Sequence, residues 1–326
     1  MSSQWSRSGS GRRGLRRPVF TLDHPDLDLD LLVLPTEDGH EWDGLLYMPR
    51  RGDPARRRIA VLVVHGSVGN YISGIPRRVS MGLAQDGFTV LSINTRMANY
   101  GAFFGGGLLH LTPLDLDAAM GALRRRGYDR VVLLGFSMGS TVVTHYQALR
   151  RPPEVIGLCT LAHPASLVNS LRRRWERFGA DPGYLDVLRT ARAALGRVPG
   201  LDADDDRGDE IFVVRRAAGP TDDPSDCEIW TYRTWWFSRG PAVEHLMSRN
   251  RIEHVGVPVL FVQAGDDLMI DPEEGPMLAR FALKGGAPRA DVVTLPGANH
   301  VFRGHEVAAI DACTAWLEDL AAAAPA

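Results

Sequence analysis

The chain has few cysteines, almost no lysine and no long apolar run. Its three cysteines, Cys159, Cys227 and Cys313, are widely spaced and form no C-x-x-C pair, which argues against a disulfide framework or a zinc site. Lys284 is the only lysine among 37 basic residues, so arginine supplies nearly all the positive charge. No apolar run reaches the roughly 20 residues that a membrane-spanning helix needs. These absences predict a cytoplasmic protein without a metal site or a membrane segment.

The 326-residue chain is close to neutral, with a formal net charge of −2. That balance gives no reason to expect nucleic acid or another polyelectrolyte as a partner. In the stretch 1–17, basic residues stand among serine and glycine, and no apolar segment follows the Arg12-Arg13 pair. We therefore expect a disordered basic tail rather than an export signal. No Walker loop, dinucleotide fingerprint or metal-ligand spacing is present, so no cofactor is expected.

Short apolar runs alternate with helical patterns along most of the chain. Four such runs predict strands of a parallel sheet, and the first, which is apolar throughout, is typical of a strand that is buried on both faces. They are residues 59–64, 88–93, 131–136 and 155–161. Before them, residues 27–34 and 44–49 flank a turn and predict an antiparallel hairpin. The alternation predicts an α/β protein with a mostly parallel, doubly wound sheet.

The alternation stops after residue 165 and resumes near residue 238. The intervening stretch contains an arginine-rich helical segment, an acidic loop and an aromatic cluster, and we interpret 166–237 as an inserted, mainly helical cap. The core then comprises 18–165 and 238–320, and 321–326 is expected to be a frayed tail. The resumed alternation predicts helices near 241–250, 273–283 and 305–320 and strands at 257–262 and 291–295.

The strongest functional signal is Gly-Phe-Ser-Met-Gly at 135–139, a Gly-x-Ser-x-Gly motif between an apolar strand and a helix. A sharp turn there would lift Ser137 into the open, and side chains at Gly135 and Gly139 would collide where strand and helix cross. Met138 would open the helix, so its backbone N–H could face an oxyanion. With 34 glycines in the chain the motif alone is weak, and its strand–turn–helix context carries the prediction.

This order of elements resembles the α/β-hydrolase superfamily over about residues 28–165 and 240–320. The resemblance implies an α/β-hydrolase fold and a serine nucleophile that is followed along the chain by an acid and then a histidine. His300 lies in a glycine-containing loop between the last predicted strand and the last helix, where the family presents its catalytic base. His305 is the nearest competitor, but it is expected to lie within the final helix.

Two acids, Asp266 and Asp267, follow the predicted strand that ends at residue 262. Family members commonly read Gly-x-x-Asp at this place, and Ala264 stands where the glycine is expected. That alignment favours Asp267 as the acid that orients the histidine and makes Asp266 its loop-capping neighbour. Because the glycine is missing, Asp266 stays open as the alternative.

His65-Gly66-Ser67 follows the first long parallel strand, where the family builds the other half of its oxyanion hole. The glycine lets the backbone turn, so that the Ser67 N–H could face the nucleophile. We therefore expect the N–H groups of Ser67 and Met138 to form the oxyanion hole. Neither residue is expected to act through its side chain.

Five further residues have two interpretations each. His65 and His163 both follow parallel strands, and each could line a substrate pocket or make structural hydrogen bonds. Trp235 and Trp236 could wall an apolar acyl pocket or anchor the cap to the core. Arg96 could tie loops together or bind a substrate carboxylate, and its place after a parallel strand favours the first role.

The sequence as a whole predicts a capped, bacterial-type serine hydrolase that cleaves a small-molecule carboxylic ester or thioester. In this interpretation Ser137 attacks the carbonyl carbon, His300 transfers the proton and Asp267 orients His300. Three alternatives use the same scaffold. An acyltransferase or cyclase would pass the acyl group to another nucleophile, a lyase need not form an acyl-enzyme, and a binding protein would catalyse nothing.

Overall fold

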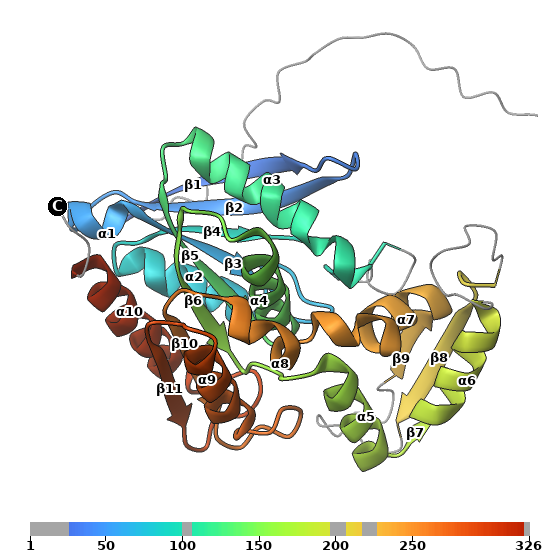
Figure 1. Cartoon of the computed structure of the whole chain (residues 1–326). Helices are drawn as coiled ribbons and strands as arrows, with labels where there is room; N and C mark the ends of the chain where they lie inside the picture. The colour runs from blue at the N-terminus through green and yellow to red at the C-terminus, as the bar shows by residue number, and fades with distance from the viewer. Residues whose placement is uncertain (1–25, 100–105, 196–206, 217–226, 323–326) are drawn as a thin grey trace, which may run out of the picture.

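The computed structural model describes residues 26–99, 106–195, 207–216 and 227–322, and the predicted basic tail at 1–17 lies outside them. An eight-stranded sheet forms the centre of the molecule (Figure 1). Its strands are β1 (Leu27–Pro35), β2 (Glu41–Pro49), β3 (Ile59–Val64), β4 (Thr89–Ile93), β5 (Arg130–Phe136), β6 (Val155–Leu161), β10 (Val259–Ala264) and β11 (Ala290–Leu295).

The strand order across the sheet is β1-β2-β4-β3-β5-β6-β10-β11. Strands β1 and β2 form the predicted antiparallel hairpin, and β2 also runs antiparallel to β4. The other neighbouring strands pair in parallel. Every residue of β3 and β4 is buried. The unbroken apolar sequence of β3 predicted this, whereas β4 also buries the polar residues Thr89 and Ser92. The mostly parallel, doubly wound sheet is thus confirmed.

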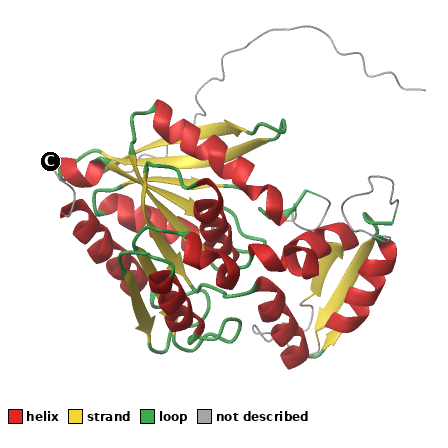
Figure 2. Cartoon of the chain, in the orientation of Figure 1, coloured by secondary structure: helices red, strands yellow, loops and turns green. Residues whose placement is uncertain are grey.

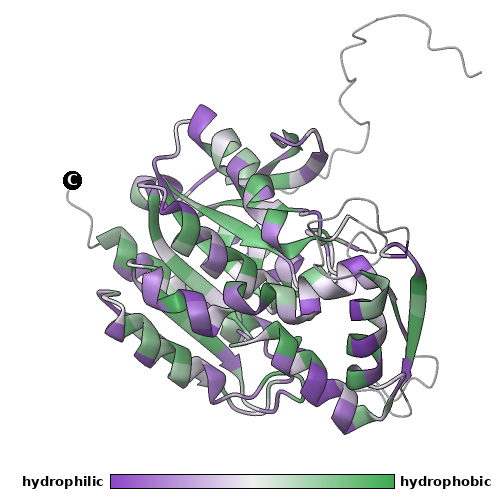
Figure 3. Ribbon diagram, turned by 45° about the vertical axis from the view of Figure 1, so that its right-hand side comes forward, coloured by the Kyte–Doolittle hydropathy of each residue, from purple (hydrophilic) through white to green (hydrophobic). Residues whose placement is uncertain are grey.

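Helices cover both faces of the sheet. Helices α2 (Gly74–Gln85) and α10 (Glu306–Ala322) pack on one face, and α3 (Thr112–Arg125), α4 (Met138–Arg150) and α9 (Glu274–Lys284) pack on the other. Each face has its own cluster of buried apolar side chains, and Figure 3 shows hydrophobic strands between helices with hydrophilic outer sides. Helix α10 includes the first two residues of the predicted frayed tail, since it continues to residue 322.

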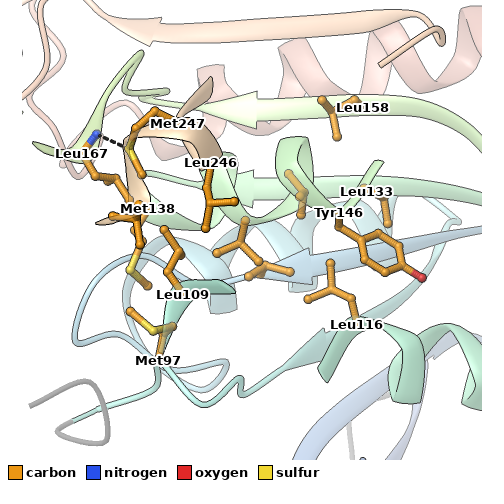
Figure 4. Packing of buried hydrophobic residues seen from close by; sticks show 14 of the residues in the cluster. Met97, Leu109, Leu116, Leu133, Met138, Tyr146, Leu158, Leu167, Leu246 and Met247 are labelled. Carbon is orange, nitrogen blue, oxygen red and sulfur yellow. Dashed lines mark hydrogen bonds between the residues drawn. The ribbon is translucent and has the colours of Figure 1, made fainter. Parts of the chain in front are cut away.

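Short helical segments connect these larger elements. They are α1 (Pro54–Arg57), η1 (Leu109–Leu111), η2 (Pro241–Leu246), α8 (Ser248–Arg251) and η3 (Ile252–His254), where η marks a 3₁₀ helix. The single helix predicted near 241–250 is wrong, because the chain is extended at Met247, with a ψ of 149°. There the Met247 sulfur accepts a hydrogen bond of 3.1 Å from the Leu167 backbone N–H (Figure 4). The segment is therefore divided at Met247 into η2 and α8.

The segment 166–237, which we call the cap, lies to one side of the sheet and contains strands as well as helices (Figure 2). Its helices are α5 (Leu167–Phe178), α6 (Tyr184–Ala194) and α7 (Tyr232–Arg239), the last of which continues two residues beyond the predicted boundary. Its strands are β7 (Ala180–Asp181), β8 (Ile211–Arg216) and β9 (Cys227–Thr231), which form an antiparallel sheet. The sequence analysis predicted the helical character of the cap and missed this sheet.

Candidate active site

Ser137 lies at a strained turn between β5 and α4. Its backbone angles are φ 53° and ψ −120°, in a region that side-chain-bearing residues rarely adopt. A Cβ on Gly135 would come within 2.5 Å of the backbone of Gly139, and a Cβ on Gly139 would collide with the Val64 carbonyl of β3. The predicted need for glycine at both positions is therefore confirmed, although Gly139 faces the neighbouring strand rather than β5.

The structure brings Ser137, His300 and Asp267 into one line of hydrogen bonds. Asp267 Oδ2 lies 2.7 Å from His300 Nδ1, and His300 Nε2 lies 3.0 Å from Ser137 Oγ. Since a carboxylate can only accept, Nδ1 carries the ring proton and Nε2 accepts from the serine hydroxyl. This arrangement could remove a proton from Ser137 and hold it on the imidazole.

Asp267 is fixed by the loop that follows β10. Its second oxygen, Oδ1, accepts hydrogen bonds from the backbone N–H groups of Met269 at 2.7 Å and Ile270 at 3.0 Å. The side chain is 2% exposed, whereas that of His300 is 15% exposed. The carboxylate thus sits behind the imidazole, away from solvent, with both oxygens engaged.

The two sequence competitors lie elsewhere. Asp266 is exposed, and its backbone N–H donates to the Ala298 carbonyl. His305 precedes α10 and is not within it as expected, and its Nδ1 lies 3.4 Å from the carbonyl oxygen of Arg303. Of the acid and histidine candidates considered in the sequence, only Asp267 and His300 are in contact with each other.

The loop after β3 runs against the nucleophile. A Cβ on Gly66 would lie 3.2 Å from the Cβ of Ser137, so glycine permits this close approach. His65 anchors the loop, because its Nδ1 contacts the Gly66 carbonyl at 2.7 Å and its Nε2 accepts from the Thr95 N–H at 3.2 Å. Burial lowers the pKa of His65 to about 4, so the ring is neutral at pH 7. His65 has the structural role that the sequence left open.

Met138 contributes its backbone to this region and its side chain to the core. As the first residue of α4, it is among the residues whose N–H groups have no acceptor within the helix. Its side chain is fully buried in the same apolar cluster as Met97 and Leu109 (Figure 4). Met138 follows Ser137 directly in the chain, and Ser67 lines the same cavity as Ser137.

A cavity of about 160 Å³ opens beside Ser137 and His300. Apolar side chains from the cap and from two core loops form much of its wall. Its lining residues are Ser67, Phe136, Ser137, Leu167, Ser170, Leu171, Arg174, Arg239, Met269, Ile270, His300 and Val301. A second cavity of about 260 Å³ shares Ser67, Phe136 and Val301 with it.

None of the four predicted pocket residues lines either of these cavities. His65 holds the loop, and the fully buried His163 bonds through Nε2 to Ser248 Oγ at 2.7 Å. Trp235 is fully buried inside the cap, where it packs against the rings of Trp175 and Tyr184, and Trp236 is 7% exposed. For these four residues the structure shows packing and hydrogen bonding, which is the other of the two interpretations that the sequence left open.

Two arginines in the cavity wall, Arg174 of α5 and Arg239 of α7, were not among the predicted site residues. Arg239 is 5% exposed, and its Nη2 donates to Ser67 Oγ and lies 3.6 Å from the Met138 sulfur. Arginine is so frequent in this chain that neither position stood out. Arg96 has the loop-tying role that the sequence favoured, because it pairs with Asp115 at 2.8 Å and Asp38 at 2.9 Å.

Within the described ranges, no group of three or more histidine, cysteine or acidic side chains is arranged to hold a metal ion. The described helices also include none that combines the length and apolar character needed to cross a bilayer.

The chain belongs to the alpha/beta hydrolase family, whose sequence profile matches residues 61–311. No curated protein is detectably similar to it in sequence. The fold is that of Est1E from Butyrivibrio proteoclasticus, solved with ferulic acid bound, at a TM-score of 0.60 and 16% identity over 89% of this chain and 99% of that one.

Two other solved structures show the same fold. The structure of DcsB in complex with its substrate analogue matches at a TM-score of 0.62 and 17% identity, over 90% of this chain and 100% of that one. The esterase domain of a Rhodothermus marinus protein matches at a TM-score of 0.56 and 17% identity, over 90% of this chain and 98% of that one. At these identities the likeness concerns the fold.

Proposed function

We propose that the protein hydrolyses a small carboxylic ester or thioester through an acyl-enzyme on Ser137. The observation that carries this proposal is the continuous line of contacts from Asp267 through His300 to Ser137 Oγ, at 2.7 Å and 3.0 Å. The membership of the alpha/beta hydrolase family and the fold shared with esterases support the same class of reaction.

In the first step, Ser137 Oγ attacks the carbonyl carbon while its proton passes to His300 Nε2. Asp267 accepts a hydrogen bond from Nδ1–H throughout, which keeps Nε2 free as the base and stabilises the imidazolium that forms. His300 then gives its proton to the leaving alcohol or thiol. Water, activated by the same imidazole, attacks the acyl-enzyme and releases the acid.

The negative charge that develops on the carbonyl oxygen requires donors that are already in place. We assign this role to the backbone N–H groups of Ser67 and Met138, which flank Ser137 on the β3 loop and at the start of α4. Losing one such donor elsewhere costs on the order of 3 kcal/mol of transition-state stabilisation. Because His65 holds the loop from within the core, the Ser67 N–H needs little rearrangement on binding.

The test is covalent labelling followed by mass spectrometry. A fluorophosphonate probe should add its mass once, at Ser137, and Ser137→Ala should abolish the adduct and lower ester hydrolysis by a factor on the order of 10³ or more. Ser170→Ala is the matched control, since Ser170 lines the same cavity but bonds to the Ser166 carbonyl instead of a histidine. It should keep the adduct.

Labelling that persists in Ser137→Ala, or active protein that never labels, contradicts the mechanism. A screen of nitrophenyl esters and acyl thioesters, with intact-mass trapping of the acyl-enzyme, then defines the leaving group. Repeating it with added alcohols and amines separates hydrolysis from acyl transfer. An acyltransferase would convert the trapped species mainly into the new ester or amide, whereas a hydrolase releases the free acid.

A further inference from the structure

Among the described residues, the wall of the cavity at Ser137 carries two positive side chains and no acidic one. Arg239 comes from the end of α7, and Arg174 comes from the middle of α5. Both belong to helices of the cap region, which lies to one side of the central sheet (Figure 1). The rest of the described wall is mostly apolar, which leaves these two guanidinium groups as its charged features.

Arg239 is buried and has no carboxylate in direct contact within the described part of the chain. Its Nη1 donates to the Ser238 carbonyl at 2.8 Å, its Nη2 donates to Ser67 Oγ, and the guanidinium lies 5.7 Å from the centre of the Trp230 ring. Burial and the neighbouring Arg174 lower the pKa of Arg239 to about 10, so the group stays charged at pH 7. A buried charge held by neutral acceptors is costly unless an anion joins it.

The nearest acid in the cap is already engaged. Glu228 forms an ion pair with Arg174 Nη2, and it accepts the indole N–H groups of Trp175 at 3.3 Å and Trp230 at 3.1 Å. Arg174 nevertheless keeps a buried Nε for which the described residues offer no hydrogen-bond acceptor. The Glu228 carboxylate is therefore engaged by Arg174 and two indole N–H groups, and Arg239 is left with neutral acceptors.

We propose that Arg239 and Arg174 form a subsite for a carboxylate carried by the substrate, so that the preferred substrates are esters that bear a second, ionised carboxyl group. A guanidinium presents paired N–H donors that match the two oxygens of a carboxylate. Arg239 also contacts Ser67, which places the subsite beside the proposed oxyanion donors, a short distance from the reacting carbonyl. This inference rests on the proposed hydrolase function and specifies its substrate class.

The test compares matched substrates on either side of the ester bond. Monoethyl adipate and ethyl hexanoate differ by a carboxylate on the acyl part, and 4-carboxyphenyl hexanoate and phenyl hexanoate differ by one on the leaving group. In at least one pair we expect kcat/KM to be about tenfold or more higher for the charged ester. Equal rates, or a preference for the neutral ester in both pairs, overturn the inference.

Variants then assign the preference to the two arginines. Arg239→Gln and Arg174→Gln should each reduce the ratio of charged to neutral kcat/KM, and Arg239→Lys should restore part of it because it keeps the charge. Arg172→Gln is the control, since Arg172 lies on the same helix but pairs with Glu176 at the surface. An undiminished ratio in both glutamine variants contradicts the proposal. If Arg239→Gln fails to fold, the inference is tested by the charged-to-neutral ratio of kcat/KM in the wild type and in Arg174→Gln.

A binding measurement separates this inference from the proposed reaction. In Ser137→Ala, which lacks the nucleophile, monoethyl adipate should bind more tightly than ethyl hexanoate by calorimetric titration, and Arg239→Gln in that background should remove the difference. If charged and neutral esters are cleaved equally well, the proposed hydrolase function stands and the carboxylate subsite is contradicted. If the protein binds the charged ester more tightly but cleaves no ester, the carboxylate subsite stands and the proposed hydrolase function is contradicted.

Discussion

At the scale of single residues, the two oxygens of Asp267 have different partners. Oδ1 accepts two backbone N–H groups, and Oδ2 faces His300 Nδ1. An asparagine could keep the two backbone bonds through its own oxygen and would then turn its NH₂ group toward the ring. Because an amide donates where the carboxylate accepts, His300 would be pushed to the tautomer with its proton on Nε2. That tautomer cannot take the proton of Ser137.

We therefore predict that Asp267→Asn lowers kcat on a nitrophenyl ester by a factor on the order of 10² to 10⁴ while the protein stays folded. Asp266→Asn, at the exposed neighbouring position, should stay close to wild type. Steady-state kinetics on both variants, with circular dichroism as the folding check, make the comparison. A similar loss in both variants would show that the loop, and not the Asp267 carboxylate, matters for turnover.

The same residues show how far local sequence could lead. Ser137 was found from its motif, because backbone strain and close packing restrict which residues can flank such a serine. Asp267 and His300 were selected by their places after strands and by family resemblance. Arg239 was missed because its importance comes from contacts with Ser67 and Met138, which lie 172 and 101 positions away along the chain. The spacing of residues along the sequence does not predict such long-range contacts.

At the scale of elements, the crossing of β5 and α4 depends on the absence of a side chain at residue 135. A Cβ on Gly135 would lie 2.5 Å from the Gly139 backbone and from Cα of Ser140, and none of these atoms can rotate away. We predict that Gly135→Ala lowers the free energy of unfolding by about 1–3 kcal/mol or more, because β5 and α4 must separate. Urea denaturation followed by fluorescence measures the change.

Gly121, within α3, provides the matched substitution for this prediction. A Cβ there would meet only the flexible end of Arg125, at 3.3 Å. Because alanine has a higher helix propensity than glycine, Gly121→Ala should raise the free energy of unfolding by up to about 1 kcal/mol. If both substitutions had the same effect, the close approach of β5 and α4 would not be limiting.

The elements that sequence patterns predicted least well are those held by tertiary contacts. The helix breaks at Met247, where the side-chain sulfur contacts the backbone of Leu167, a residue 80 positions earlier. Strand β8 exposes Ile211 and Val213, and its pairing with β9 spans a stretch that the structure does not describe. Strand formation in such a small sheet depends on partners more than on local preference. The buried parallel strands, in contrast, could be identified from their own composition.

At the scale of the whole molecule, three buried histidines link stability to pH. Burial lowers the pKa of His65 and His145 to about 4 and that of His163 to about 3, from an ordinary value of 6.5. Below that ordinary value the unfolded chain takes up protons that the folded protein does not. The stabilisation is therefore complete above about pH 6.5 and is lost as the pH falls toward 4.

We predict that the free energy of unfolding falls between pH 6.5 and pH 5 by on the order of 2 kcal/mol for each of these histidines. Urea titrations at several pH values measure the slope. Replacing one of them, as in His163→Gln, should lower stability at pH 7 and make the dependence on pH shallower. A slope that does not change in this variant would mean that the His163 ring is protonated in the folded protein.

The contact between Arg239 and Ser67 joins the last helix of the cap to the loop after β3, across 172 positions of sequence. In a chimera that carries the cap of another hydrolase, Ser67 Oγ would lose this donor. In the reverse graft, with a foreign loop after β3, the guanidinium would lose its acceptor. In any exchange of these parts between hydrolases, the cap and the loop after β3 should therefore be transplanted together.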